Sequence, residues 1–235
     1  MEIIVLKNTN YKEKDAIIEG LSEEGTKSFL VKGLLSPKCS NIVLGTNLIV
    51  ADIELQEGKY KHPIIKKSQV MVTPYHLNDD IDILNCLNLI DEITLNLIPA
   101  EERTPLYPWL RNAIMEFQNQ KISPFSIALT YFMKVLGESG YSFEVNHCVR
   151  CDGKTNIVAF SFNDGGFICK KCITDEINRN LSNEAMLSIR KAVNLQEYKE
   201  IEYLNFDVFK EIMNELKSFA LDYLGVKLTS ISLFS

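Results

Sequence analysis

Residues 148–172 read CVRCDGKTNIVAFSFNDGGFICKKC, and this stretch contains two Cys-x-x-Cys pairs, namely Cys148 with Cys151 and Cys169 with Cys172. The pairs are 17 residues apart, a spacing typical of a four-cysteine zinc site. Two residues between cysteines allow a tight turn to direct both sulfurs at one centre. Apolar β-formers flank Asn-Asp-Gly-Gly at 163–166, which predicts a hairpin that brings the pairs together. The segment therefore predicts a zinc hairpin.

Two other readings of these cysteines fit less well. Paired disulfides would suit a secreted protein, and a single Cys-x-x-Cys would suit a redox enzyme, but two pairs across a hairpin are typical of neither. Four thiolates fill a tetrahedron and leave no position for water, so we expect a structural zinc. His147 adjoins Cys148, and we expect it to point sideways or outward rather than to replace a ligand.

Length and composition place the chain among ordinary soluble proteins. It has 235 residues, enough for two domains, with 46% apolar and 24% charged residues. Its apolar runs are shorter than a membrane span, and its first residues lack the basic start of a signal peptide, so we expect a cytoplasmic protein. Cys39 and Cys86 have no paired spacing, and we expect them to be reduced and buried.

Charge is distributed unevenly along the chain. The net charge is −6, but residues 1–76 hold ten lysines against nine acids, whereas residues 77–235 hold fifteen basic residues against twenty-two acids. Any contact with a polyanion is therefore expected in the N-terminal part or on a local patch.

The N-terminal part has the pattern of a small β-domain. Short runs rich in Val, Ile and Leu alternate with turn residues and predict five strands, at Ile3–Lys7, Asp15–Glu19, Lys27–Gly33, Leu48–Gln56 and Ile64–Thr73. Strands at this spacing indicate a small barrel or sandwich. Five strands suit an OB-fold, although composition alone does not separate it from an SH3-like barrel.

After Pro74 the apolar period changes to that of helices. We expect one helix capped by Asn78 or Asp79 and reaching Ile98, and others at 106–120, from Ser123 to Gly137 or Gly140, at 174–179, from Ser182, and at 205–224. The expected buried faces are Phe125, Leu129, Phe132, Met133 and Leu136 in one helix and Phe209, Ile212, Met213, Leu216, Phe219 and Tyr223 in the last, which Gly225 ends. The tail Lys227–Phe234 reads as a β-like run.

Motifs of catalysis are missing from the sequence. It contains neither a phosphate-binding loop, nor a dinucleotide fingerprint, nor His-Glu-x-x-His. The acids Asp79, Asp80 and Asp82 are read as the first turn of a helix rather than as a metal site, because acids suit a helix N-terminus. The sequence therefore does not argue for an enzyme.

The lysines of the first domain are the remaining candidates for function, namely Lys7, Lys12, Lys14, Lys27, Lys32, Lys38, Lys59, Lys61, Lys66 and Lys67. For most of them a solvated surface is sufficient explanation. Residues 1–76 contain no arginine, and lysine lacks the fork that reads a guanine edge. A lysine groove would therefore bind a nucleic-acid backbone independently of sequence.

Several segments together resemble the RecO family, the bacterial recombination mediators of DNA repair. The opening VLKNTNYKEKDAIIEGLSEEGTKSFLVKGLLSPKC, with Tyr11, Glu13 and Asp15 and with Lys32-Gly33, looks like the start of such proteins. LGESGYSFEVNHCVRCDG followed by FSFNDGGFICKKC resembles their zinc module, and YLGVKLTSISLF resembles their C-terminus. One departure is the segment after Lys32-Gly33, which is often more basic in the family.

The resemblance implies an α+β protein with an N-terminal OB-fold that contacts DNA (1–76), a helical body (77–146 and 173–235) and an inserted zinc hairpin (147–172). It also implies binding to single- and double-stranded DNA, annealing of complementary strands, and RecA loading with RecR and the single-strand-binding protein. The latter's acidic tail would need an apolar pocket beside a base such as Arg111 or Lys134. The implied location is cytoplasmic and nucleoid-associated.

Three hypotheses follow from these patterns. The first is a DNA repair mediator without a catalytic site, in which Cys148, Cys151, Cys169 and Cys172 hold zinc and Lys7, Lys12, Lys14, Lys27, Lys32 and Lys38 contact phosphates. The second is a zinc-dependent hydrolase or nuclease, for which four thiolates and three histidines are a poor ligand set. The third is a zinc-stabilised protein-interaction scaffold without DNA activity.

Overall fold

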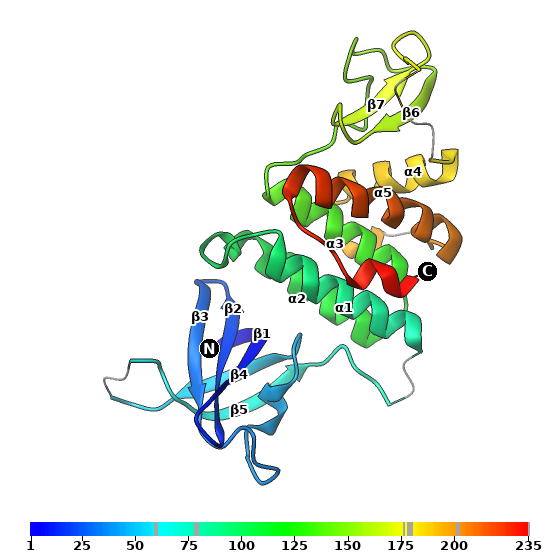
Figure 1. The fold of residues 1–235 in the computed structure, drawn as a ribbon. Coiled ribbons are helices and arrows are strands. Elements are labelled where there is room, and N and C mark those ends of the chain that lie inside the picture. Colours follow the sequence, from blue (N-terminus) through cyan, green and yellow to red (C-terminus); the bar gives the residue numbers. More distant parts are fainter. Residues whose placement is uncertain (59–60, 78–79, 176, 178–180, 201–202, 235) are drawn as a thin grey trace. The chain divides into compact units, whose positions relative to one another are not determined.

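The structure is a computed structural model that describes residues 1–58, 61–77, 80–175, 177, 181–200 and 203–234. The chain divides into two compact units, one made of Met1–Asp79 with Ile98–Asn119 and the other of Asp80–Leu97 with Gln120–Ser235. The fold is α+β, with an antiparallel sheet in the first unit and a helical bundle carrying a small hairpin in the second (Figure 1).

The first unit is built on five antiparallel strands, which confirms the five strands predicted from the sequence. They are β1 (Glu2–Tyr11), β2 (Asp15–Ser22), β3 (Gly25–Val31), β4 (Val50–Leu55) and β5 (Ile65–Val72), in the order β3-β2-β1-β4-β5. One isolated bridge, Leu30 with Ile64, joins the two edges, and the amide of Leu30 donates to the Pro63 carbonyl over 2.8 Å. Alternate residues of the strands, such as Ile3, Val5, Ile18 and Phe29, form one buried core.

Helix α2 (Tyr107–Asn119) belongs to the same unit as the sheet. Arg111 binds Glu2 of β1 through its Nε, which lies 2.6 Å from Oε1, and Tyr107 donates its hydroxyl to the same carboxylate. Arg103, which is 5% exposed, donates to the Ile98 carbonyl and pairs with Glu19 of β2. Partner groups that satisfy a buried guanidinium in this way offset much of its desolvation cost.

The described residues of the second unit form a bundle of four α-helices, α1 (Ile81–Asn96), α3 (Pro124–Glu138), α4 (Asn183–Asn194) and α5 (Phe206–Leu224). Helix α3 is central, and its predicted face is buried. The side chains of Ser182 and Asn205 cap α4 and α5, and Gly225 ends α5 with φ +67°. The predicted face of α5 is also buried except for Tyr223, which is 45% exposed. No helix within the described residues is long and apolar enough to span a membrane.

Three local predictions for this unit need correction or lie outside the described residues. The cap of α1 is Asp80, which accepts from the Ile83 amide, whereas Asn78 and Asp79 lie outside the described residues. The C-terminal run is a 3-10 helix (Ser230–Phe234) rather than a strand. The helix predicted at 174–179 lies largely outside the described residues, of which Thr174, Asp175 and Ile177 are not helical.

The hairpin predicted between the cysteine pairs is present as β6 (Ile157–Ser161) and β7 (Gly166–Cys169). Within the second unit it lies outside the helical bundle, on the side of α4 and α5 (Figure 1). Phe160 and Phe162 of the hairpin contact Phe143, whose ring centroid is 5.3 and 5.4 Å from theirs. Phe219 of α5 lies 5.6 Å from both Phe143 and Phe162, so an aromatic cluster attaches the hairpin to α5.

Candidate metal centre

The structure brings the four predicted cysteines to one point. The Sγ atoms of Cys148, Cys151, Cys169 and Cys172 all lie within 4.8 Å of one another, and those of Cys151 and Cys169 are 3.6 Å apart. A tetrahedral ion with metal–sulfur bonds of about 2.3 Å places its sulfurs about 3.8 Å apart. A disulfide would require about 2.05 Å. The arrangement therefore fits a metal tetrahedron.

Each pair forms a turn whose backbone amides face the first sulfur. Burial raises the pKa of Cys148, but the amides of Cys169, Arg150 and Cys151 donate to its sulfur and lower the pKa to about 6. Burial likewise raises the pKa of Cys169, but hydrogen bonds from the Lys171 amide, the Cys151 side chain and the Cys172 amide leave this pKa lowered. Donors aimed at a buried sulfur favour the thiolate, which is the form that binds metal.

The fourth sulfur shows why the cluster suits a cation. Hydrogen bonding to Cys151 is the main cause that raises the pKa of Cys172 to about 12, with burial and the other two sulfurs adding to it. Without a cation, several thiolates this close repel one another, so one sulfur keeps its proton and donates it. A dication would replace that proton and allow all four thiols to ionise.

Arg150 connects three segments around the cluster, and sequence reasoning did not single it out. Its Nε and Nη2 each lie 2.9 Å from Asp164 Oδ1 in the hairpin turn, and its Nη1 donates to the Cys172 carbonyl over 3.0 Å. Asp164 also accepts from the Ser161 hydroxyl. One guanidinium thus ties the first turn to the hairpin and to the second turn. The partners are 14 and 22 residues away, beyond any local pattern.

Gly166 allows a third segment to pair with the hairpin. Its φ is +156°, and a Cβ at this position would lie 2.1 Å from the Glu144 carbonyl oxygen. Glu144 pairs with the hairpin through its amide, which donates to the Gly165 carbonyl, and through its carbonyl, which accepts from Phe167. Only glycine permits this close approach of two backbones.

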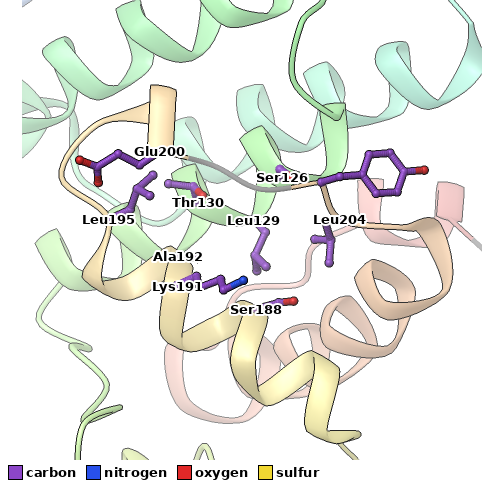
Figure 2. Close-up of a pocket in the computed structure, with 10 residues that line it drawn as sticks. Ser126, Leu129, Thr130, Ser188, Lys191, Ala192, Leu195, Glu200 and Leu204 are labelled. Carbon is purple, nitrogen blue, oxygen red and sulfur yellow. The ribbon is translucent and has the colours of Figure 1, made fainter.

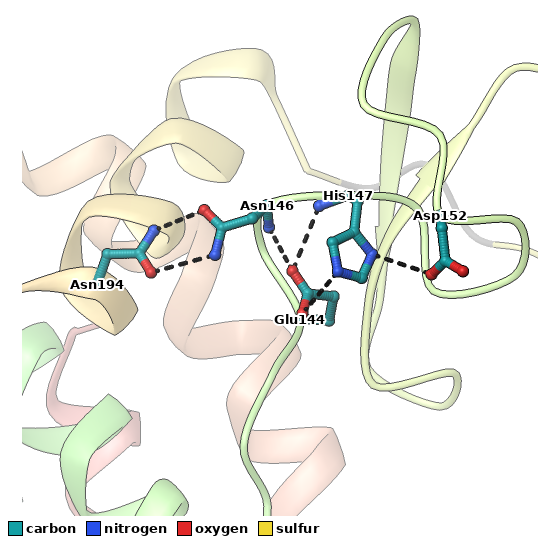
Figure 3. A network of polar contacts seen from close by, with 5 residues as sticks. All are labelled: Glu144, Asn146, His147, Asp152 and Asn194. Carbon is teal, nitrogen blue, oxygen red and sulfur yellow. Dashed lines mark hydrogen bonds and ion pairs between the residues drawn. The ribbon is translucent and has the colours of Figure 1, made fainter.

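His147 lies beside the cluster but does not belong to it, as expected. Its ring nitrogens face Glu144 Oε2 at 3.2 Å and Asp152 Oδ1 at 3.4 Å (Figure 3). Glu144 also accepts from the amides of Asn146 and His147, and Asn146 exchanges side-chain hydrogen bonds with Asn194 of α4. This chain of polar contacts connects the cysteine module to the helices.

The predicted DNA-binding lysines separate into two groups in the first unit. Lys12 and Lys14 lie in the turn between β1 and β2, and the loop after β3 carries Lys32 and Lys38. The two segments are adjacent, because the Leu35 amide donates to the Lys14 carbonyl over 3.0 Å and the Gly33 amide donates to Asp15. The structure therefore gathers these four exposed lysines, called here the lysine end of the sheet.

Lys7 and Lys27 lie elsewhere on the same sheet. Lys7 is exposed and stands opposite Glu19 in the β1–β2 register. Lys27 of β3 is engaged in an ion pair, with its Nζ 2.5 Å from Glu24 Oε2. An ion-paired lysine has less free charge to offer a phosphate, so Lys27 is the weakest of the six candidates. Lys59 and Tyr60 lie outside the described residues.

Comparison with known proteins assigns the chain to a family. The family model described as "Recombination protein O C terminal" matches residues 78–231. The DNA repair protein RecO of Acetivibrio thermocellus is 26% identical over 233 residues, covering 96% of this chain and 90% of that protein. The RecO proteins of Halalkalibacterium halodurans and Syntrophomonas wolfei are 22% and 26% identical over 73% and 72% of this chain, and 68% of each of them is covered. The chain therefore belongs to the RecO family.

Proposed function

We propose that this protein is a recombinational DNA repair mediator. It binds single- and double-stranded DNA, anneals complementary strands and, acting with RecR, helps to load RecA onto DNA coated with single-strand-binding protein. The observation that carries the proposal is the family match over residues 78–231, together with relatives named as DNA repair proteins along most of the chain.

The N-terminal sheet is proposed to be an OB-fold that contacts DNA. The strand order β3-β2-β1-β4-β5 and the bridge between Leu30 and Ile64 support a sheet that curves until its edges meet. The lysine end of the sheet supplies the phosphate contacts, with Lys7 as a further contact on β1. A surface that carries lysines but no arginines suits binding that is independent of base sequence.

The cysteine cluster is proposed to bind zinc in a structural role. Four sulfurs are the ligand set that zinc prefers, and they leave no open coordination position for a substrate. Bound zinc would neutralise the thiolates and fix the two turns and the hairpin as one body. The protein is accordingly proposed to act by binding rather than by catalysis.

A pocket of the second unit is the proposed site for the acidic tail of single-strand-binding protein. Arg111 and Lys134 do not serve this role well, because Arg111 pairs with Glu2 and Lys134 donates to the carbonyls of Val193 and Leu195. Burial lowers the pKa of Lys134, so its amine is less readily protonated. The pocket combines leucine side chains and hydroxyl groups with one base, Lys191, and one acid, Glu200, and it is lined by Ser126, Leu129, Thr130, Ser188, Lys191, Ala192, Leu195, Glu200, Tyr203 and Leu204 (Figure 2).

Peptide binding tests this assignment directly. A peptide with the sequence of the acidic tail is titrated into the protein, and we expect Lys191→Glu to weaken binding several-fold because it repels the peptide. Lys217→Glu is the matched control, because Lys217 is exposed on α5 and does not line the pocket. Equal affinities of the two variants would place the tail elsewhere.

Salt-dependent DNA binding tests the proposed contacts. We expect replacement of Lys14, Lys32 and Lys38 by Glu to abolish most affinity for a single-stranded oligonucleotide. The slope of log K against log salt should fall by about 0.7 for each phosphate that the protein no longer neutralises. Lys27→Glu is the control and should change little, because Lys27 is paired with Glu24. Unchanged affinity and slope in the triple variant would contradict the lysine assignment.

The net charge of −6 favours one alternative, a zinc-stabilised interaction scaffold without intrinsic DNA activity. The same titration separates the two functions. A folded, zinc-loaded protein that binds no oligonucleotide at low salt, where electrostatic contacts are strongest, would support the scaffold.

A further inference from the structure

The four cysteines of the metal centre differ in their access to solvent. Cys148 and Cys169 are buried, Cys172 is partly buried, and Cys151 is exposed. Cys151 is therefore the most exposed of the four residues. Its Sγ lies 3.6 Å from that of buried Cys169, so the most exposed cysteine has a second sulfur within van der Waals distance.

We propose that Cys151 is a site of oxidative modification by peroxides, and that its oxidation joins it to Cys169 and dismantles the metal centre. The proposal rests on the proposed zinc site. Two geometric conditions meet at this position: exposure of Cys151 to solvent and a neighbouring sulfur placed to react next.

The chemistry needs hydrogen peroxide or an organic hydroperoxide as the oxidant. The Cys151 thiolate attacks one peroxide oxygen, the O–O bond breaks, an S–O bond forms, and hydroxide (or alkoxide) leaves. The Cys169 thiolate then attacks the Cys151 sulfur, an S–S bond forms, the S–O bond breaks, and hydroxide leaves. The two sulfurs together lose two electrons and the peroxide gains two, and two protons convert the leaving groups to water (or alcohol and water).

Formation of this disulfide requires only a small movement of the two side chains. The two sulfurs must approach from 3.6 Å to about 2.05 Å, a shift that side-chain rotation can supply. Afterwards only Cys148 and Cys172 remain reduced, and two ligands do not complete a tetrahedron. The hairpin would then depend on Arg150, Asp164 and the aromatic cluster alone, so oxidation should loosen it.

The sequence allows each cysteine to be followed separately in the intact wild-type chain. Trypsin places Cys148, Cys151, Cys169 and Cys172 on four different peptides, 135–150, 151–154, 155–170 and 172–179. The zinc-loaded chain is treated with hydrogen peroxide, with and without dimedone to trap sulfenic acid, and its peptides are analysed by mass spectrometry. A chromophoric chelator measures released zinc in parallel.

We expect dimedone to label Cys151 about tenfold more than each other cysteine of the cluster, because Cys151 is the exposed one and access to the sulfur limits the reaction. Without dimedone, peptides 151–154 and 155–170 should become linked, with one zinc released per link. Gly153→Ala should slow labelling while keeping all four ligands, because its Cβ would lie 3.3 Å from Cys151 Sγ.

Two results would overturn the proposal: equal labelling of all four cysteines, or a dominant link that involves Cys148 or Cys172. Failure of the zinc assignment is separately visible, because the isolated protein would then contain no stoichiometric zinc before any peroxide is added. In either case, detection of the linked peptides 151–154 and 155–170 shows whether oxidation joins Cys151 to Cys169.

Discussion

At the scale of single residues, Arg150 and Gly166 contact the segments that carry the four sulfurs. Arg150 supplies hydrogen bonds to the hairpin turn and to the second cysteine turn at once, and Gly166 permits the backbone of Glu144 to lie against β7. Neither touches the metal position. Both therefore act on metal affinity through the positions of the ligands.

Replacing Arg150 should weaken metal binding without removing a ligand. We expect Arg150→Gln to lower zinc affinity by about 10- to 100-fold, the usual effect of losing a group that orients ligands. Competition with a chromophoric chelator measures this. Arg190→Gln, on the exposed side of α4, is the control. An unchanged affinity in Arg150→Gln would show that the cysteine turns hold their geometry alone.

Gly166 and Gly165 offer a matched pair for the hairpin turn. Both have positive φ, but a Cβ at Gly165 meets nothing within 4 Å, whereas one at Gly166 would overlap Glu144. Gly165→Ala should cost about 1–2 kcal/mol from its backbone conformation. Gly166→Ala should cost clearly more and release zinc at a lower temperature. Equal melting curves of the two variants would contradict the pairing of Glu144 with the hairpin.

At the scale of elements, Glu92 of α1 holds the C-terminal 3-10 helix. Its carboxylate accepts hydrogen bonds from the amides and hydroxyls of Thr229 and Ser230. Burial raises the pKa of Glu92, but these four hydrogen bonds outweigh it and leave the pKa lowered. The contact spans 137 residues of chain and fixes the tail on the helical bundle.

The lowered pKa of Glu92 predicts a pH dependence of stability. A carboxyl group whose pKa is lowered on folding stabilises the fold above its unfolded pKa, and this contribution is lost as pH falls through the folded pKa. We expect Glu92→Gln to be less stable than the wild type at neutral pH and the difference to shrink below pH 4.5, the ordinary value. Urea unfolding at several pH values measures it. A difference that persists unchanged at low pH would contradict the ionic contact.

Local patterns predicted the strands and the main helices because their apolar periods and caps lie within a few residues. The C-terminal segment was predicted wrongly as β-like, although its buried residues Leu228, Ile231 and Phe234 recur every three positions, which is the period of a 3-10 helix. What fixes that segment is Glu92, far away in the chain, and such a partner leaves no local pattern.

The candidate site was predictable to a similar extent. The spacing of the four cysteines indicated the cluster, since a metal site made of two turns is encoded locally. Arg150 and the grouping of Lys12 and Lys14 with Lys32 and Lys38 depend on contacts between separate segments. Sequence reasoning treated all six lysines alike, whereas the ion pair of Lys27 with Glu24 distinguishes one of them.

At the scale of the whole molecule, the proposed DNA contacts and the excess negative charge lie in different parts of the chain. The lysine end belongs to the first unit, whereas the excess of acidic over basic residues lies within residues 77–235. A small cationic patch on an acidic protein should bind DNA reversibly and release it as salt rises. Such reversible contact suits the proposed mediator, which would transfer its strand to a partner.

The most direct test of this account is annealing of complementary oligonucleotides coated with single-strand-binding protein, measured at two salt concentrations. The zinc-loaded protein should accelerate annealing, less so at the higher salt, and replacement of Lys14, Lys32 and Lys38 by Glu should remove the acceleration while Lys27→Glu keeps it. Equal acceleration by the wild type and the triple variant, or none from the wild type even with RecR present, would contradict a mediator that acts through the lysine end of its sheet.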